Sequence, residues 1–466
     1  MARTGFQGGT RTASDTRHLG TLVGDGPLAG GAPGARIIAL STCAVFSDTS
    51  LLRTYWRTDP GGIDSGIQGH LYTSPDDTFI VRMPRDTRRA VDHLSRCLAA
   101  NAEIWASLTG IRLATCDSRV VLAADHASVA TTRLPPTMSW QVGTLAEAAA
   151  AEYRSGNGSL LAFVLDEQTA DALGVRDARL LRQARLTSLL MDKNHAMTLL
   201  ERSGVPAAHT YALTEAEWLA GRLRDVPEHN RYVFKPAGGA AGIGVFFDAQ
   251  HGSSMSEIED HLRVLANSGR LPHRFQVQEF LAGTPHGVSA YLPGDGTAHI
   301  LEAHRQVMDA AGRCVGARWT PDIESDQVDA ARAVYQRLAH GGQHPLSGLV
   351  CLDLIGGRVI EVNPRLTACA PIAHLRHVEA HIASHRGGGF RITQIDVHTS
   401  VPVPTQCLHD GRLRALIDRL QTDYGVLALP QGLNPFGPCR FVFVNDTTSG
   451  TAQQVFLRQI ERLGHS

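Results

Sequence analysis

Lysine is almost absent from this sequence of 466 residues. Of the 44 basic residues only Lys193 and Lys235 are lysines, and the other 42 are arginines. Where arginine is used so freely, a lysine indicates a position that needs a compact ammonium group on a flexible stem, because a planar guanidinium has a different shape and hydration. We therefore expect each of the two lysines to have a specific task.

Other features are also missing, and each absence excludes a class of protein. No apolar run approaches the roughly 18 to 20 residues that span a bilayer, and residues 1–6 lack the charged and then apolar pattern of a secretory signal. The net charge is −1, with 44 basic and 45 acidic residues, so no strong field favours nucleic acid or anionic lipid. The eight cysteines are scattered and form no CxxC pair, and this distribution indicates reduced thiols. We expect a soluble, cytoplasmic protein with neither a nucleic-acid nor a membrane partner.

The length predicts about three domains at roughly 150 residues each. Residues 1–35 contain nine glycines and almost no large apolar residue, so we expect a disordered tail. Residues 36–185 alternate short apolar runs with helix-forming stretches, which is typical of an α/β domain. The expected strands are 36–40, 79–83, 120–123 and 160–164, and the expected helices are 88–100 and 146–153.

A second region, residues 186–385, opens with an expected helix over 186–202. Gly204 follows its last apolar turn and Pro206 lies beyond, which is a strong stop signal. Two pairs of apolar runs come later and predict hairpins, so this region is α+β: 232–235 with 245–247, and 349–355 with 359–362. Residues 386–466 form a smaller C-terminal part, with a helix expected near 412–421 and a strand at 440–444.

The first candidate site is a glycine-rich loop that follows a strand ending in Lys235. Four glycines occur within seven residues, including Gly239, Gly242 and Gly244. Such a loop can bring backbone N–H groups close to phosphate oxygens. It is neither a Walker A loop, in which the lysine follows the glycines, nor a dinucleotide GxGxxG, which a helix follows. A merely flexible hairpin is the alternative, and the rare lysine favours phosphate binding.

The second candidate site is the pair of apolar runs that carries Asp353, Glu361 and Asn363. Buried carboxylates have a desolvation cost unless something compensates their charge. Magnesium prefers such oxygen ligands, and takes one or two carboxylates together with waters and phosphates. These three residues are therefore candidate metal ligands, with a hairpin bearing solvent-facing acids as the alternative.

The register of this hairpin decides whether the three side chains meet. Glu361 and Asn363 are two residues apart on a strand and share a face. A two-residue turn, Gly356–Gly357, would place Ile360 opposite Asp353, whereas a three-residue loop, 356–358, would place Glu361 there. The two glycines allow the left-handed residue of a bulged turn. We predict the three-residue loop and an Asp353–Glu361 pair.

Together with the run Gln278, Glu279, Phe280 and Leu281, which leaves a strand for a turn, these motifs resemble the ATP-grasp ligases in order and spacing over residues 186–375. The resemblance implies a pre-ATP-grasp α/β domain at 36–185, an ATP-grasp core of two α+β subdomains at 186–385, and a C-terminal domain at 386–466. It implies ATP between the two subdomains and two Mg²⁺ ions. The implied ATP-binding residues are Lys193, Lys235, the loop glycines, Gln278, Glu279 near the adenine amino group, and the backbone of Phe280 and Leu281; the implied metal ligands are Asp353, Glu361 and Asn363.

One departure from the family pattern concerns the ribose. Many ATP-grasp members have an acidic residue soon after the turn that follows the adenine-binding run, but this chain has Thr284, Pro285 and His286 there. The residue that contacts the ribose is therefore unassigned.

The flanking regions resemble the peptide ligases of pheganomycin-type biosynthesis, which implies a role in making an antibiotic. The implied reaction activates a small acid as an acyl phosphate, which the amine of an amino acid or peptide then attacks to give an amide, ADP and phosphate. Fixed positive charges stabilise the transferring phosphoryl group. We propose Arg305 and Arg365 for phosphoryl and carboxylate oxygens, because arginine binds both in a bidentate way; Arg318 is a weaker candidate.

Two other activities remain open: an ATP-grasp ligase with a non-amine acceptor, and a nucleotide-binding scaffold without catalysis. The intact carboxylates and both lysines argue against the scaffold. His374, His377, His381 and His385 have the spacing of one helix face, which indicates a solvated or substrate-lining surface or, as the alternative, a zinc site. Cys351 is interpreted as a core residue, since acyl phosphate chemistry needs no thiolate.

Overall fold

The computed structural model describes most of the chain, with gaps. The described residues are 37–40, 75–83, 87–110, 112–113, 115, 117–124, 134–142, 145–156, 159–161, 165–238, 244–310, 312, 314–319, 321–340, 348–365, 367, 375, 392–395, 407–408, 411–433, 440–444 and 451–464. The predicted tail at 1–35, Gly239, Gly242 and the four histidines between 374 and 385 lie outside these ranges.

The N-terminal part is a parallel sheet of five strands with the order β4-β3-β2-β1-β5. Its elements are β1 (Ile37–Leu40), β2 (Thr78–Arg82), α4 (Thr87–Thr109), β3 (Arg119–Ala124), β4 (Met138–Val142), α5 (Leu145–Arg154) and β5 (Ser159–Leu161). Strands such as β2 and β3 are buried, as expected of a parallel sheet covered by helices. The predicted mixed α/β fold is confirmed here, although α4 extends beyond the predicted end at residue 100.

The predicted single helix over 186–202 is wrong, because the chain forms two helices there. After α6 (Glu167–Ala172) come α7 (Ala178–Leu190) and α8 (Lys193–Arg202). Asp192 is extended, with φ −78° and ψ 110°, and its carboxylate accepts a hydrogen bond of 3.0 Å from the His195 N–H, as an N-cap does. Lys193 is therefore the first residue of α8. The helix ends before Gly204, whose φ is 64°, as the stop signal predicts.

A small antiparallel sheet follows, with the order β6-β8-β7. Its elements are β6 (Thr210–Thr214), α9 (Glu215–Leu219), the short 3-10 helix η4 (Arg222–Asp225), β7 (Tyr232–Pro236), α10 (Met255–Asn267) and β8 (Arg274–Glu279). One sheet face packs against α10 through Phe234, Phe275 and Leu262. The run predicted as a strand at 245–247 pairs with β7 at one point, through two backbone hydrogen bonds of 2.9 and 3.0 Å between Phe234 and Phe246.

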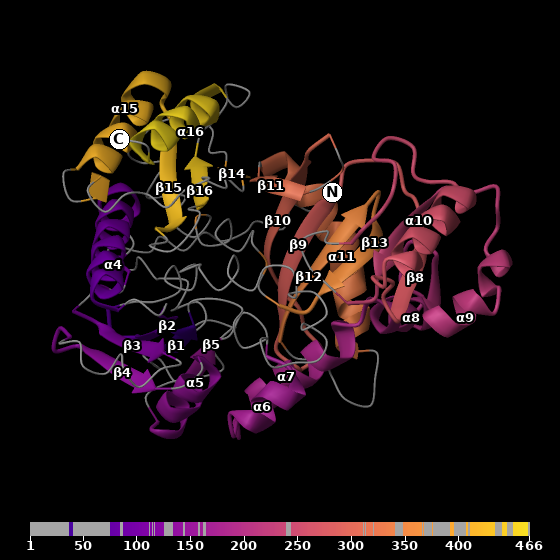
Figure 1. Cartoon of the computed structure of the whole chain (residues 1–466), viewed down its shortest axis with the longest axis horizontal. Helices are drawn as coiled ribbons and strands as arrows, with labels where there is room; N and C mark the ends of the chain where they lie inside the picture. Colours follow the sequence, from indigo (N-terminus) through magenta and orange to yellow (C-terminus); the bar gives the residue numbers. More distant parts are fainter. Residues whose placement is uncertain are drawn as a thin grey trace, which may run out of the picture.

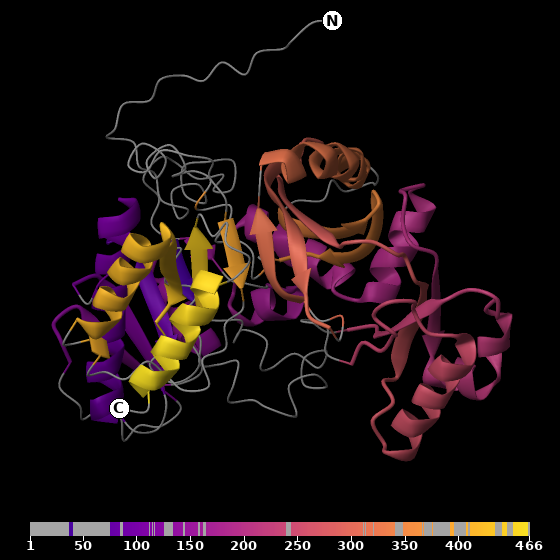
Figure 2. The ribbon, with the colours of Figure 1, turned by 90° about the horizontal axis from the view of Figure 1, so that it is seen from above.

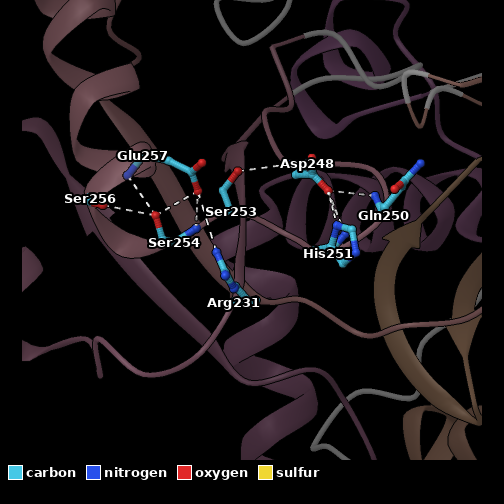
Figure 3. A network of polar contacts seen from close by, with 8 residues as sticks. All are labelled: Arg231, Asp248, Gln250, His251, Ser253, Ser254, Ser256 and Glu257. Atoms are coloured by element: carbon cyan, nitrogen blue, oxygen red, sulfur yellow. Dashed lines mark hydrogen bonds and ion pairs between the residues drawn. The ribbon is translucent and has the colours of Figure 1, made fainter.

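Local hydrogen bonds hold the segment between the glycine-rich loop and α10 (Figure 3). The Asp248 carboxylate accepts from the backbone N–H groups of Gln250 and His251, at 3.0 and 2.7 Å. Ser254 and Glu257 form a capping box at the start of α10. Arg231, which precedes β7, lies 3.9 Å from the Glu257 carboxylate. This network ties the end of the loop segment to the small sheet.

The largest sheet has eight strands in the order β13-β12-β9-β10-β11-β14-β16-β15 (Figure 1). Its first part comprises β9 (His286–Leu292), β10 (His299–Met308), β11 (Cys314–Trp319), α11 (Pro321–His340), β12 (Gly348–Ile355) and β13 (Arg358–Asn363). Helices α7, α8 and α11 cover one face of this part in a shared core that includes Val288, Leu352 and Tyr335. The opposite face carries the polar residues of the candidate site.

The C-terminal strands β14 (Ile392–Ile395), β15 (Leu427–Gly432) and β16 (Arg440–Val444) extend this sheet, and α15 (Arg412–Tyr424) and α16 (Thr451–Gly464) pack nearby. These elements lie beside the N-terminal part of the chain in both views (Figures 1 and 2), next to α4 in Figure 1. They share one hydrophobic core with α4, and the buried Trp105 donates a hydrogen bond of 2.6 Å to the Pro430 carbonyl. The two ends of the chain thus form one packed body.

Among the helices in the described ranges, none combines the length and the apolar character needed to cross a membrane.

Candidate functional site

The β12–β13 hairpin places Asp353 directly opposite Glu361, as predicted, but by a different route. The predicted three-residue loop is wrong: the turn has two residues, Gly356 and Gly357, with φ of 55° and 75°, and Ile355 pairs with Arg358. Two positive φ values are what a two-residue hairpin turn requires. The register then shifts because Ile360 is an extra residue, a β-bulge, on β13. Without the bulge, the two-residue turn would place Ile360 opposite Asp353. With the bulge, Glu361 takes that position.

The candidate metal ligands therefore share one face of the sheet. The Asn363 side-chain amide donates to the Asp353 carboxylate at 3.2 Å, and Arg365 donates to the Asn363 side-chain oxygen at 3.0 Å. Arg365 thus lies within the same cluster.

Both lysines of the chain approach the same strand, β13. Lys193 Nζ lies 3.6 Å from Glu361 Oε1, and Lys235 Nζ donates a hydrogen bond of 3.0 Å to the carbonyl of the bulged Ile360. Both side chains are buried, and the Lys193 backbone N–H also donates to the Ala237 carbonyl at 2.6 Å. Two ammonium groups that come from α8 and β7, far apart in the sequence, therefore converge on one carboxylate strand.

The charges in this cluster perturb one another strongly. Burial, reinforced by the neighbouring Glu361 charge, raises the pKa of Asp353 to about 7. Burial also opposes ionisation of Glu361, yet Lys193, Lys235 and Arg365 outweigh it and the pKa of Glu361 is lowered. Burial lowers the pKa of Lys235 to about 8, against the attraction of Glu361 and Asp353. Such opposed shifts are typical of functional sites.

The donor set fits magnesium bound together with phosphates. Among the described residues, no group of three or more His, Cys, Asp or Glu side chains is arranged to hold a metal ion, so these ranges contain no self-sufficient cage. Two facing carboxylates with an amide oxygen leave most coordination positions to waters and phosphates, as Mg²⁺ prefers. Two like charges in register also repel each other unless a cation lies between them.

The face of the small sheet that carries Lys235 fits a polar ligand. Lys235 pairs in register with Gln276, so both side chains lie on this face, as does Gln278, which donates to Thr210 at 3.1 Å. Gln276 Oε1 and Asn194 Oδ1 are buried without a hydrogen-bond partner in the described structure. Buried acceptors without a hydrogen-bond partner are rare in folded proteins, and a ligand with donor groups would satisfy these two.

Glu279 and Phe280, which are expected at the adenine, lie at the end of β8 and form contacts within the protein. The Glu279 carboxylate forms an ion pair with Arg358, at 2.7 Å to Nη2 and 3.3 Å to Nη1. The Phe280 N–H donates to the Arg231 carbonyl at 2.8 Å. Arg358, at the start of β13, also donates to the Ala207 carbonyl at 3.0 Å, a role that sequence reasoning missed.

Two further predicted residues, Gly244 and Arg305, lie outside the cluster of carboxylates and lysines. Gly244 has a φ of 75°, and a Cβ there would lie 2.9 Å from Pro236, so the loop passes close to the strand end that carries Lys235. Arg305 is exposed and pairs with Arg318 and His286, whereas Asp353 aligns with His304 one residue earlier. Because side chains alternate along a strand, Arg305 lies on the face opposite the carboxylates.

Sequence reasoning also missed Ser289, Glu302 and His304. They occupy the carboxylate face on β9 and β10, and Glu302 and His304 are buried. The signal was available, because Glu302 and His304 stand two apart in a strand and so share a face.

Residues 190–369 match the family described as ATP-grasp domain, which covers less than half of the chain. No protein of curated function matches the sequence. Solved structures with a similar chain course include an L-amino acid ligase from Bacillus licheniformis (11% identity; 83% of this chain and 96% of that chain; TM-score 0.45). A second is a phosphoribosylamine–glycine ligase from Thermotoga maritima (15% identity; 83% of this chain and 96% of that chain; TM-score 0.43). A third is an N5-carboxyaminoimidazole synthetase from Staphylococcus aureus with ADP (9% identity; 82% of this chain and 96% of that chain; TM-score 0.47).

The matched range begins just before Lys193 and ends just after Arg365, so it contains the whole cluster described above. Both lysines, the glycine-rich loop and the β12–β13 hairpin fall within it. Residues 190–369 of this chain are therefore similar to the ATP-grasp domain family.

Proposed function

We propose that this protein is an ATP-dependent carboxylate–amine ligase that joins a small acid to the amine of an amino acid or peptide. The observation that carries the proposal is the convergence of Lys193 and Lys235 on the strand whose Glu361 faces Asp353. A negatively charged ligand with bound cations would complement these opposite charges. The resemblance of the flanking regions to pheganomycin-type ligases supports a peptide as the amine substrate.

Two steps make the amide. In the first, a carboxylate oxygen of the acid bonds to the γ-phosphorus, the bond from that phosphorus to the β–γ bridging oxygen breaks, and ADP leaves. In the second, the amine nitrogen bonds to the acyl carbon, the carbon–oxygen bond to phosphate breaks, and the amine loses a proton. A carboxylate is a poor electrophile, so the mixed anhydride is what makes attack by the amine possible.

The residues of this chain would bind and orient the reactants. Lys193 and Lys235 would neutralise phosphate oxygens, and the loop that ends at Gly244 would cover them with backbone N–H groups. Arg365, which donates to Asn363, would add positive charge beside the transferring phosphoryl group. Asp353, Glu361 and Asn363 would hold Mg²⁺, two ions in our proposal, which when bound supplies further positive charge to the phosphates.

The substrates would meet the nucleotide on the carboxylate face of the large sheet. Farther along that face Ala317 and Trp319 join the core shared by the N-terminal and C-terminal elements. The acid and the amine would therefore bind between this body and the ATP-grasp domain. Arg305, which the sequence suggested for phosphoryl and carboxylate oxygens, lies on the opposite face of β10 and would not contact substrates bound on the carboxylate face.

The test is release of ADP and phosphate with Mg²⁺ and ATP, in a screen of carboxylic acids against amino acids and short peptides, with mass spectrometry of the products. Lys235→Ala and Glu361→Ala would be compared with Glu259→Ala, a matched control on the exposed face of α10. The proposal requires a new amide mass that is present in wild type and the control and absent in the two site variants. ATP binding without turnover across the whole panel would favour the scaffold instead.

A further inference from the structure

A polar triad of Ser289, which is half-buried, and the buried Glu302 and His304 lies on the carboxylate face and has no role in the reaction above. The Ser289 hydroxyl donates to one Glu302 oxygen, and the other Glu302 oxygen lies 2.8 Å from His304 Nδ1. Glu302 and His304 are 0% and 1% exposed. Both carboxylate oxygens are thus engaged inside the protein, and the imidazole is held at one nitrogen.

The sheet register places this triad in line with the candidate metal ligands. One row across the strands runs His304, Gly287, Asp353, Glu361. The next row runs Glu302, Ser289, Cys351, Asn363. Residues opposite one another in a sheet point to the same face, so the triad and the metal ligands form one continuous polar surface.

Gly287, between His304 and Asp353, leaves the space that the imidazole fills. A Cβ at Gly287 would overlap both Cε1 and Nε2 of His304. The Cε1–Nε2 edge of the ring therefore lies over Gly287 on β9, the strand between those that carry His304 and Asp353. Any larger residue at position 287 would displace the ring.

Stability does not explain why such a pair is kept in the interior. Burying a carboxylate and an imidazole costs several kcal/mol of desolvation in typical proteins, and well-packed apolar residues often do as well or better. Metal sites give a different reason, because groups behind the direct ligands orient them and tune their affinity.

We propose that His304 is a positioning residue for Asp353, fixed by Glu302 and Ser289 and seated over Gly287. It holds the Asp353 carboxylate toward Glu361, on the side where the metal binds. This inference rests on the proposed function, in which Asp353 is a metal ligand. It assigns the triad to metal affinity and leaves nucleotide binding to the lysines.

The experiment measures binding of Mn²⁺, as a probe for Mg²⁺, to the full chain saturated with ADP, from the electron paramagnetic resonance signal of free Mn²⁺. The variants are His304→Asn, whose amide ends short of Gly287, His304→Gln, whose amide reaches as far as Nε2, and Gly287→Ala, which keeps the imidazole but moves it. His261→Gln is the matched control, because His261 stacks on Phe246 in the small subdomain. Thermal melting and ADP affinity without metal verify the fold.

We expect His304→Asn and Gly287→Ala to weaken Mn²⁺ binding about tenfold, the lower end of the range for groups behind metal ligands. His304→Gln should recover part of the loss, and ADP affinity without metal should stay at the wild-type value. Wild-type Mn²⁺ affinity in both His304→Asn and Gly287→Ala would overturn the inference, as would a wild-type protein that binds no Mn²⁺ with ADP. Weakened binding supports it whether or not wild type forms an amide, so the proposed reaction can fail separately.

Discussion

Lys193 and Glu361 lie 3.6 Å apart, Nζ to Oε1, although one begins α8 and the other is on β13. Their side chains are 8% and 20% exposed, so solvent screens the pair little. We expect Lys193→Ala to weaken ADP binding at least tenfold, since a hydrogen bond to a charged group contributes roughly 1.5 to 3 kcal/mol. Lys193→Arg should not restore it, because a guanidinium does not fit a site that holds a compact ammonium. Calorimetric titration with ADP measures both, with Arg263→Ala as the exposed control; affinities within twofold of wild type would contradict the expectation.

The bulge at Ile360 offers a test of backbone geometry. Deleting Ile360 would turn β13 into a regular strand and still leave Glu361 opposite Asp353, because the turn has two residues. What the deletion removes is the carbonyl that accepts from Lys235 at 3.0 Å. We predict that the deletion keeps a cooperative melt and lowers kcat/KM for ATP at least tenfold. Retained kcat/KM would mean that Lys235 is positioned without the bulge.

The Glu279–Arg358 pair predicts a pH dependence. The side-chain hydrogen bond from Arg358 is the main reason that the pKa of Glu279 is lowered from its ordinary value of 4.5. A carboxyl with a lowered pKa adds stability above its unfolded-state value, and loses it as the pH falls through the folded-state value. Wild type should therefore lose stability below about pH 4.5 more steeply than Glu279→Gln. The difference should be small, about 1 kcal/mol or less, because the two side chains are 33% and 37% exposed.

Thermal melts between about pH 3 and 6 measure this difference. Glu259→Gln is the matched control, since Glu259 forms an exposed ion pair with Arg263 within one helix. Identical acid slopes for wild type and Glu279→Gln would contradict the prediction.

Trp105 connects the two ends of the chain. Its side chain is fully buried in the core shared by α4 and the C-terminal elements, and its Nε1 donates to the Pro430 carbonyl. Trp105→Ala should lower stability by about 3 to 5 kcal/mol, as large cavities in cores do. Trp105→Phe should cost less, because it keeps most of the packing and loses the hydrogen bond. Urea unfolding measures both, and equal stability of the two variants would show that packing at this position is unimportant.

The candidate site was partly predictable because its parts are local in sequence. Asp353 and Glu361 lie on consecutive strands, so apolar character and the Gly-Gly turn were enough to bring them together. The turn itself was predicted wrongly, since a two-residue turn with a bulge and a three-residue loop give the same pairing. The rarity of lysine predicted a specific task for each of the two lysines, and in the structure both are buried beside β13.

The features that could not be predicted from the sequence depend on contacts between segments that are distant along the chain. The triad of Ser289, Glu302 and His304 forms because β9 lies between β10 and β12, an order that no single strand encodes. The position of Arg305 depends on the parity of its pairing with His286, which a strand prediction leaves open. Arg358 reaches Glu279 only because β13 lies against the end of the small sheet.

By itself, the sequence determined the types of local structure and the kinds of chemical group: the caps and stops of the helices, the apolar strands, the glycine-rich loop, two rare ammonium groups and two carboxylates on apolar strands. These follow from side-chain volume, backbone freedom and the cost of burying charge, which act over a few residues. Only the tertiary structure decided which groups meet, because strand order, register and shared cores are set by burial summed over segments hundreds of residues apart. The convergence of Lys193 and Lys235 on β13, and the packing of Trp105 against Pro430, belong to that second kind.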